Sequence, residues 1–243
     1  MMKDEIRNIT VITLKDLKAY YFKPATISWG ILFPTVFLLI FSLKNSSDIS
    51  TLIGGLISMS IFFGSTSMTT TSIMLERRTN VFDIYYTLPV SYYGIVAGKV
   101  SSGFLFGIFS SLIMLVISIF IADFKIYSAL YFILWILVSS FAFSSFGVFM
   151  SLLVKEAYDA MIYMNLIRLP LIFISGVFLP IKELPAILRS LAYISPLTYS
   201  VDMAGEVFLN KSFIGMNLSL LILTLFGVIF FMLSRYRVEH LRE

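Results

Sequence analysis

The sequence contains no cysteine and only one histidine, and charged residues make up just 13% of its 243 residues. Without cysteine, a disulfide framework, an iron–sulfur cluster and a thiolate zinc site are all excluded. Hydrophobic residues account for 58% of the chain, whereas soluble domains carry about 45–50% apolar and about 25% charged residues. Such a chain cannot cover a water-facing surface, so lipid must surround most of it. This excludes a soluble enzyme, a disordered regulator and a nucleic-acid-binding domain.

Long apolar runs take the place of the missing polar surface. A helix needs about 20 mostly apolar residues to cross a hydrocarbon core of about 30 Å, and the runs are too long and too irregular for barrel strands. They cover residues 25–43, 51–75, 100–122, 129–154, 161–179 and 214–234. The sequence therefore predicts an all-α polytopic membrane protein in which residues 1–243 form a single transmembrane domain with six transmembrane helices.

Lysine and arginine orient these helices, because cytoplasmic loops carry an excess of both residues. With six spans the two termini lie on one side. Of the 18 lysines and arginines, twelve lie on the side of the termini and five on the other, while Arg168 lies inside a span. The twelve are Lys3, Arg7, Lys15, Lys18, Lys23, Arg77, Arg78, Lys99, Lys155, Arg235, Arg237 and Arg242. Both termini are therefore predicted to be cytoplasmic.

Residues 1–24 have the pattern of an amphipathic helix. Its apolar side chains fall within one arc of about 140°, with basic residues beside or opposite that arc. The arc contains Ile6, Ile9, Leu14, Leu17, Tyr20 and Tyr21. Val11 and Ile12 break the pattern. An apolar face with basic flanks suits the membrane interface, so we expect a helix that lies in the headgroups, or one whose polar face also touches a cytoplasmic partner.

Residues 180–213 form the longest segment on the outer side. Leu184, Ile187, Leu188 and Leu191 have helical spacing, and Ser195-Pro196 ends that helix. A second short helix is expected from Val201 to Phe208. The pair either caps the outer mouth of the bundle or lies on the leaflet.

Residues 76–99 form the longest cytoplasmic loop. A short helix is expected over residues 79–87, ending before Pro89 because the residue that precedes a proline avoids the helical conformation. One face of it contains Phe82, Tyr85 and Tyr86. An exposed apolar patch of this kind needs a cover, either a partner protein or the lipid headgroups.

The same loop contains an incomplete phosphate-binding pattern. Three residues, not the required four, separate Gly94 from Gly98, and a valine follows Lys99 where a serine or threonine would bind Mg²⁺. The segment also opens a lipid-spanning helix. We conclude that the chain has no nucleotide site of its own.

Ionisable residues inside the spans are few. Arg168 is the clear ionisable case; either it snorkels toward the cytoplasmic headgroups, or it faces a cleft, where Asn165 or an anionic substrate group meets it. No aspartate or glutamate lies in mid-span, which disfavours an ion-coupled carrier. Ser65 and Thr69 are interpreted first as helix-packing groups and alternatively as residues that line a pathway. Without a His or Cys pair an intramembrane enzyme is hard to build.

Three motifs, in order along the chain, resemble the membrane subunit of type-2 ABC transporters, the exporter permeases with six spans per half. The first is Glu76-Arg77, Thr79-Asn80, Asp83, Pro89-Val90 and Gly98-Lys99. Here Asn80-Val81 replaces the usual Gly-Thr, and Tyr85-Tyr86 replaces aliphatic residues. The second is Ser175-Gly176-Val177-Phe178-Leu179-Pro180 with Leu184-Pro185. The third is Ser195-Pro196-Leu197-Thr198-Tyr199 with Val201-Asp202.

The resemblance implies a permease subunit without catalytic activity and without a bound cofactor. ATP and Mg²⁺ are then bound by a separate ABC ATP-binding subunit, which docks on residues 76–99, the coupling loop of this family. A second permease subunit, identical or different, completes the substrate path. The resemblance assigns Glu76, Arg77, Asp83, Tyr85 and Pro89 to the ATPase interface. Asn165, Arg168, Ser65 and Thr69 are the candidates for the path.

We therefore expect an ATP-driven exporter in a prokaryotic cell membrane, with lipids as its surroundings. Its expected substrate is amphipathic, namely a drug-like molecule, a lipid-linked molecule or a peptide. The alternatives are a stand-alone secondary carrier, a membrane-embedded lipid-modifying enzyme, and a non-transporting immunity or sensor subunit on the same scaffold.

Overall fold

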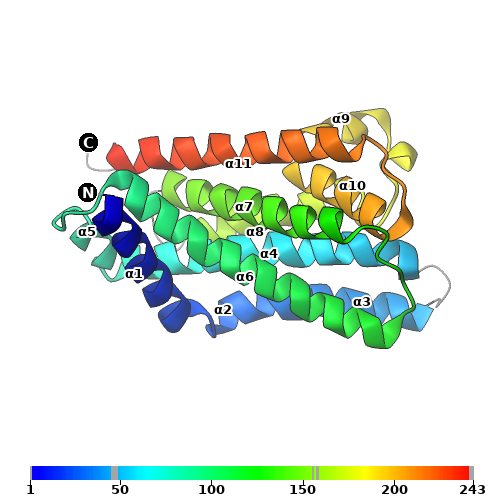
Figure 1. Ribbon diagram of the computed structural model, residues 1–243, viewed down its shortest axis with the longest axis horizontal. Coiled ribbons are helices and arrows are strands. Elements are labelled where there is room, and N and C mark those ends of the chain that lie inside the picture. Colours follow the sequence, from blue (N-terminus) through cyan, green and yellow to red (C-terminus); the bar gives the residue numbers. More distant parts are fainter. Residues whose placement is uncertain (1, 45–48, 155, 157–158, 241–243) are drawn as a thin grey trace.

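Helices make up most of the chain, and no strand occurs among the residues that the computed structural model describes, 2–44, 49–154, 156 and 159–240. The long helices lie roughly side by side in an elongated bundle (Figure 1). All the helical elements, in chain order, are α1 Met2–Tyr20, α2 Pro24–Ile27, the π-helical turn η1 Ser28–Leu32, α3 Phe33–Lys44, α4 Ile49–Arg78, α5 Val81–Ile84, α6 Tyr92–Ile121, α7 Ala129–Leu153, α8 Asp159–Ile174, the 3₁₀ turn η2 Ile181–Glu183, α9 Ala186–Ile194, α10 Pro196–Leu209 and α11 Met216–Glu239.

The predicted all-α polytopic membrane protein is confirmed. Four helices in the described chain are long and apolar enough to cross a membrane. They are Leu52–Arg78, Tyr92–Ile121, Ala129–Leu153 and Met216–Glu239. The fifth apolar run ends earlier than expected, because α8 stops at Ile174 and Gly176 takes a positive φ of 86°, a conformation that ends helices. The number of spans stays a prediction.

The arrangement of the ends agrees with a shared side for the termini. The beginning of α1, the end of α11 and α5 lie at one end of the bundle, and α9 lies at the other (Figure 1). That this side is cytoplasmic stays a prediction. Lys155 and Arg242, two of the twelve residues in the charge count, lie outside the described residues.

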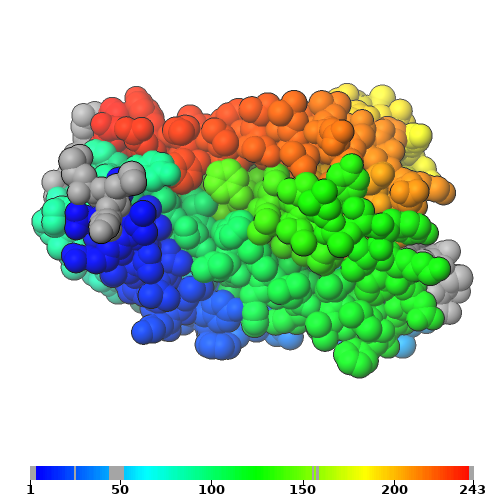
Figure 2. All heavy atoms as spheres, viewed as in Figure 1, coloured from blue at the N-terminus to red at the C-terminus, as the bar shows by residue number. Residues whose placement is uncertain are grey.

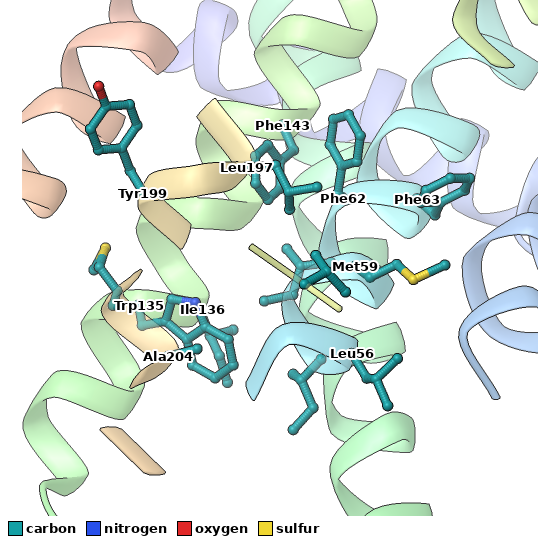
Figure 3. Close-up of a cluster of buried hydrophobic side chains, with 14 of the residues drawn as sticks. Leu56, Met59, Phe62, Phe63, Trp135, Ile136, Phe143, Leu197, Tyr199 and Ala204 are labelled. Atoms are coloured by element: carbon teal, nitrogen blue, oxygen red, sulfur yellow. The ribbon is translucent and has the colours of Figure 1, made fainter. Parts of the chain in front are cut away.

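Helix α4 lies at the centre of the bundle. In its apolar stretch 94% of the residues are buried, and its neighbours include α6, α7, α8 and α10. Figure 2 shows α6 (green) and α11 (orange to red) forming much of the outer surface on one face. Part of the core between α4, α7 and α10 appears in Figure 3, where Phe62, Trp135 and Leu197 point toward one another's helices.

Small residues let α4 approach its neighbours closely. A Cβ atom added at Gly103 of α6 would lie 2.9 Å from the backbone oxygen of Ser65. One added at Gly147 of α7 would clash with Thr69. The Thr69 hydroxyl donates back to the Ser65 carbonyl at 3.1 Å. Ser65 and Thr69 thus lie at close contacts with α6 and α7, which supports the helix-packing interpretation. That they line a path stays a prediction, and it would require α4 to separate from α6 and α7.

The outer segment forms two helices joined at Ser195-Pro196, as predicted. Ser195 caps α10 by accepting a hydrogen bond from the Leu197 amide at 3.2 Å, and Pro196 occupies the first turn. Helix α10 is longer than expected and is buried against α4 and α7, whereas α9 exposes apolar side chains such as Ile187. Only α10 therefore contributes to the bundle core.

The N-terminal helix forms, and one face of it is buried against the bundle. Ile12, Thr13 and Asp16 are buried, whereas Ile6 and Leu14 are exposed. Helix α1 packs on α6, where a Cβ atom added at Gly98 would lie 2.7 Å from Ile12. The exposed Ile6 and Leu14 belong to the predicted apolar arc and suit contact with lipid, so the interfacial placement of the helix stays a prediction. The contact with α6 was not predicted, because it depends on a glycine and on a polar anchor, neither of which enters a count of apolar residues.

Candidate functional site

The loop between α4 and α6 changes direction sharply at its beginning. Asn80 takes the left-handed conformation with φ 58°, so α5 is a single turn, Val81–Ile84, and not the expected helix over residues 79–87. At the other end Ser91 caps α6 by accepting a hydrogen bond from the Gly94 amide at 2.9 Å. The loop is therefore fixed at both ends.

The aromatic residues of this loop point into the bundle. Phe82 and Tyr85 are buried, and the Tyr86 hydroxyl donates to the carbonyl of Val238 on α11 at 2.9 Å. The predicted exposed aromatic patch is therefore wrong. Buried tyrosine hydroxyls need partners, and these partners lie on the neighbouring helices. The apolar side chains that face outward are those of Val81, Ile84 and Leu88, which are 36%, 50% and 48% exposed.

Behind the loop lies a buried ionic cluster that joins α1, α4 and α6. We define it as Lys15 and Asp16 of α1, Glu76 of α4 and Lys99 of α6. Lys99 Nζ lies 2.9 Å from Asp16 Oδ2 and 2.5 Å from Glu76 Oε2. Lys15 Nζ lies 2.9 Å from Asp16 Oδ1 and also pairs with Glu76. Two ammonium groups and two carboxylates balance, which is what permits such burial.

Tyr85 connects the ionic cluster to the loop. Lys15 Nζ donates to the Tyr85 hydroxyl at 2.6 Å, and this hydroxyl donates to Glu76 Oε1 at 3.2 Å. Burial raises the pKa of Tyr85, so its hydroxyl keeps its proton at neutral pH. Glu76 of α4, Asp16 of α1 and Lys99 of α6 are almost fully buried. A displacement of the loop therefore acts, through Tyr85, directly on these three helices.

Sequence reasoning singled out only Glu76 among the four members of the ionic cluster. Asp16 was not named, Lys15 appeared only in the charge count, and Lys99 appeared in the charge count, in the rejected phosphate pattern and in the first family motif. One signal was available: Ile9, Ile12 and Asp16 follow each other at helical spacing, so an acidic residue continues an apolar stripe. An isolated carboxylate at such a position requires a buried cation.

Titration of Lys15 should be visible in the stability of the protein. Burial first, and the Lys99 ammonium second, lower the pKa of Lys15 from 10.5 to about 8, against the opposing effect of Asp16. Between these values the unfolded chain still holds a proton that the folded chain has released. The free energy of unfolding should therefore rise with pH across this window.

The expected rise is below about 1 kcal/mol because solvent screens a partly exposed charge, and the Lys15 side chain is 36% exposed. Thermal unfolding in mild detergent from pH 7 to pH 10, compared with the Lys15→Met variant, isolates this contribution. A wild-type curve that falls relative to the variant would contradict it.

The other predicted interface residues lie around the ionic cluster. Arg77 Nη1 donates to the carbonyl of Val154 at 2.7 Å, at the end of α7. Asp83 is exposed, and so is Pro89, whose carbonyl accepts from Asn8 Nδ2 at 3.4 Å. Glu76 and Tyr85 thus lie inside the protein, while Asp83 and Pro89 lie on its surface.

An apolar groove runs between α1 and the loop. Its volume is about 280 Å³, and it is lined by Asn8, Val11, Ile12, Lys15, Val81, Ile84, Tyr85, Leu88 and Val90. The exposed side chains of Val81, Ile84 and Leu88 thus border a hollow whose lining includes Lys15 of the ionic cluster. Such a surface suits a protein partner better than a small ligand.

The predicted path residues do not form a common site in this structure. Arg168 is fully buried between α8 and α4, with Nη1 donating to Ser67 Oγ at 2.8 Å. Snorkelling to the headgroups is therefore wrong for Arg168. No described contact joins Asn165 to Arg168, so the expected pair does not form. Among the described residues no group of three His, Cys, Asp or Glu side chains could hold a metal ion.

Comparison with known proteins gives concordant matches. Residues 7–209 match the family described as ABC-2 type transporter. The inner membrane transport permease YadH of Escherichia coli (strain K12) is 24% identical over 178 residues, which are 73% of this chain and 67% of YadH. The probable multidrug ABC transporter permease YbhR of the same strain is 24% identical over 158 residues, 65% of this chain and 43% of YbhR. Nodulation protein J of Sinorhizobium fredii (strain NBRC 101917 / NGR234) is 32% identical over 100 residues, 41% of this chain and 38% of that protein.

Proposed function

Since this chain belongs to the ABC-2 type transporter family, as the match over residues 7–209 shows, we propose that it is the permease half of an ATP-driven exporter of amphipathic molecules. The chain is a multi-pass membrane protein and a permease subunit. The name of YbhR, a probable multidrug ABC transporter permease, supports export of a drug-like or lipid-like substrate. ATP and Mg²⁺ are bound by a partner subunit, and the chain itself is not an enzyme.

The observation that carries the proposal is the apolar groove with its exposed side chains Val81, Ile84 and Leu88. An apolar surface at the end of the bundle where both terminal helices lie needs a protein cover. We assign the ATP-binding subunit to it. The exposed Asp83 and Pro89 belong to the same surface.

The ionic cluster gives this docking surface a mechanical role. When the ATP-binding subunit moves the loop, Tyr85 and Glu76 pull on Lys15, and Asp16 and Lys99 follow through their ion pairs. Charge pairs in a dry interior resist separation. The movement therefore passes into α1, α4 and α6 as a unit, and α4 carries it to the centre of the bundle. A second permease subunit completes the path for the substrate.

Substitution of the docking surface tests the proposal. The tagged chain is purified from its host in mild detergent, and the ATP-binding subunit is expected to accompany it at about one to one. Ile84→Asp should reduce the amount of bound partner by about tenfold, because a desolvated carboxylate costs at least 1.4 kcal/mol of binding free energy. The matched control is Ile187→Asp on α9, which is also exposed but lies at the opposite end of the bundle.

Each alternative function has its own outcome. A chain that stays alone in nanodiscs with the ATPases of its host added is a stand-alone carrier or a lipid-modifying enzyme. If the chain forms the complex but no amphiphile stimulates its ATPase activity, the chain is an immunity or sensor subunit. If Ile84→Asp and Ile187→Asp lost the ATP-binding subunit to the same extent, this loop would not be its docking surface.

A further inference from the structure

Helix α8 contacts the bundle through one narrow stripe that contains a cation. Its buried residues recur every four positions, namely Ala160, Met164, Arg168 and Ile172. Residues at this spacing lie on one helix face, and an apolar side chain would complete the stripe at the third position. Arg168 is instead completely buried there, with its guanidinium 5.2 Å from the ring of Phe63 on α4.

The Arg168 guanidinium has few partners. It carries five N–H donors, but the described structure gives it one hydrogen bond, from Nη1 to Ser67 Oγ at 2.8 Å. Nε and Nη2 have no partner within the described chain, and none of its ion pairs includes Arg168. A buried cation without a carboxylate costs several kcal/mol. In a membrane protein, a charge of this kind marks a ligand or ion site.

Lys99 differs from Arg168 in its partners. Lys99 is equally buried but lies within 3 Å of two carboxylates, so its charge is balanced within the chain. The contacts described for the Arg168 guanidinium are with the Ser67 hydroxyl and the Phe63 ring, and neither carries a charge. The anion that balances Arg168 must therefore come from outside the described chain.

Helix α8 is built to move away from α4 at low cost. It has only 16 residues, and Pro170 cannot donate a hydrogen bond to the carbonyl of Leu166. Beyond its end Gly176 takes a φ of 86°. On its buried stripe Met164 and Ile172 flank Arg168 by one turn on either side, so a movement away from α4 uncovers an apolar surface next to the guanidinium.

We propose that Arg168 binds the acidic group, a carboxylate or a phosphate, of an amphipathic substrate when α8 moves away from α4. The two unpaired donor nitrogens, Nε and Nη2, match a planar pair of acidic oxygens, and the apolar part of the substrate packs against Met164 and Ile172, which flank Arg168 on the same stripe. The inference rests on the proposed transport function and narrows its substrate class to acidic amphiphiles.

Tryptophan fluorescence can report binding at this site. The chain has two tryptophans, and the Trp29 ring stacks on Phe63 at 6.1 Å, the same ring that Arg168 contacts. In a Trp135→Phe background Trp29 is the sole emitter. The probes are 2-bromododecanoate, which quenches on contact, and its methyl ester, which carries the same bromine without the charge. The absence of cysteine excludes alkylation of a thiol by the probe.

The experiment measures quenching in nanodiscs of phosphatidylcholine without the ATP-binding subunit. We expect saturable quenching with an affinity for the acid about tenfold higher than for the ester. Arg168→Met, which suits the apolar stripe, should remove this preference, and Arg168→Lys should retain part of it. Arg189→Met, which removes a cation from α9, should leave the preference unchanged. Equal affinities in the wild type, or a preference that survives in Arg168→Met, would overturn the proposal.

Two further arms give the source of the acid and separate this inference from the function on which it rests. If added phosphatidic acid displaces the bromo acid, the acidic group belongs to a membrane lipid; if it does not, the ligand is a single-chain acid. Preserved binding in a chain that recruits no ATP-binding subunit would overturn only the exporter proposal. ATP-driven transport that continues unchanged in Arg168→Met would overturn only the role of Arg168.

Discussion

Lys99→Met is expected to destabilise the protein by about 3–5 kcal/mol, the range found when one partner of a buried ion pair is removed. The substitution leaves two buried carboxylates, those of Asp16 and Glu76, facing only the half-exposed ammonium of Lys15. Unfolding by sodium dodecyl sulfate in mixed micelles measures the loss. Lys18→Met on the exposed side of α1 is the matched control and should change stability little.

A double-mutant cycle separates the pair from its surroundings. Asp16→Asn alone leaves the ionic cluster with an excess positive charge, whereas Asp16→Asn combined with Lys99→Met leaves Lys15 paired with Glu76. The double variant should therefore be more stable than the sum of the single losses predicts, by about 1–3 kcal/mol. Additive losses would show that the two side chains do not interact, contrary to their 2.9 Å separation.

Gly103→Ala is expected to cost about 1–3 kcal/mol, because overpacking of a tightly packed interior strains its surroundings. The added Cβ atom would lie 2.9 Å from a backbone oxygen of α4 and 3.0 Å from Cβ of Ser144 on α7, and it would clash with the Thr69 methyl group. The same detergent titration measures the loss.

Gly94→Ala on the same helix is the control, because its Cβ would meet only side-chain atoms, at 3.2 Å and 3.4 Å. If the Gly103→Ala variant were as stable as the Gly94→Ala variant, α4 and α6 would not be packed tightly at Gly103.

The helical class and the turns could be read from the sequence, because they depend on the length of apolar runs and on proline. The break at Ser195-Pro196 is local chemistry, and it appears where expected. The N-terminal helix also forms as predicted. The early end of α8 was missed because the left-handed conformation of Gly176 depends on what packs around it.

The candidate site was harder to predict because periodicity shows which residues share a face, not what that face meets. Phe82 and Tyr85 share a face as expected, but it turns toward α1 and α4 once Asn80 reverses the chain. The pairing of Asp16 with Lys99 joins residues 83 positions apart. No spacing rule reaches that far, so only the three-dimensional packing of α1 on α6 brings them together.

The central position of α4 has a consequence for how the protein is made. Of the four span-length helices in the described chain it is the least apolar and the most buried, 94% against 28% for Met216–Glu239. Alone in lipid its many hydroxyl groups would face acyl chains, whereas the glycines of α6 and α7 offer them close packing. Both helices leave the ribosome after α4. The segment at the heart of the protein therefore depends for stable insertion on helices that do not yet exist when it reaches the membrane.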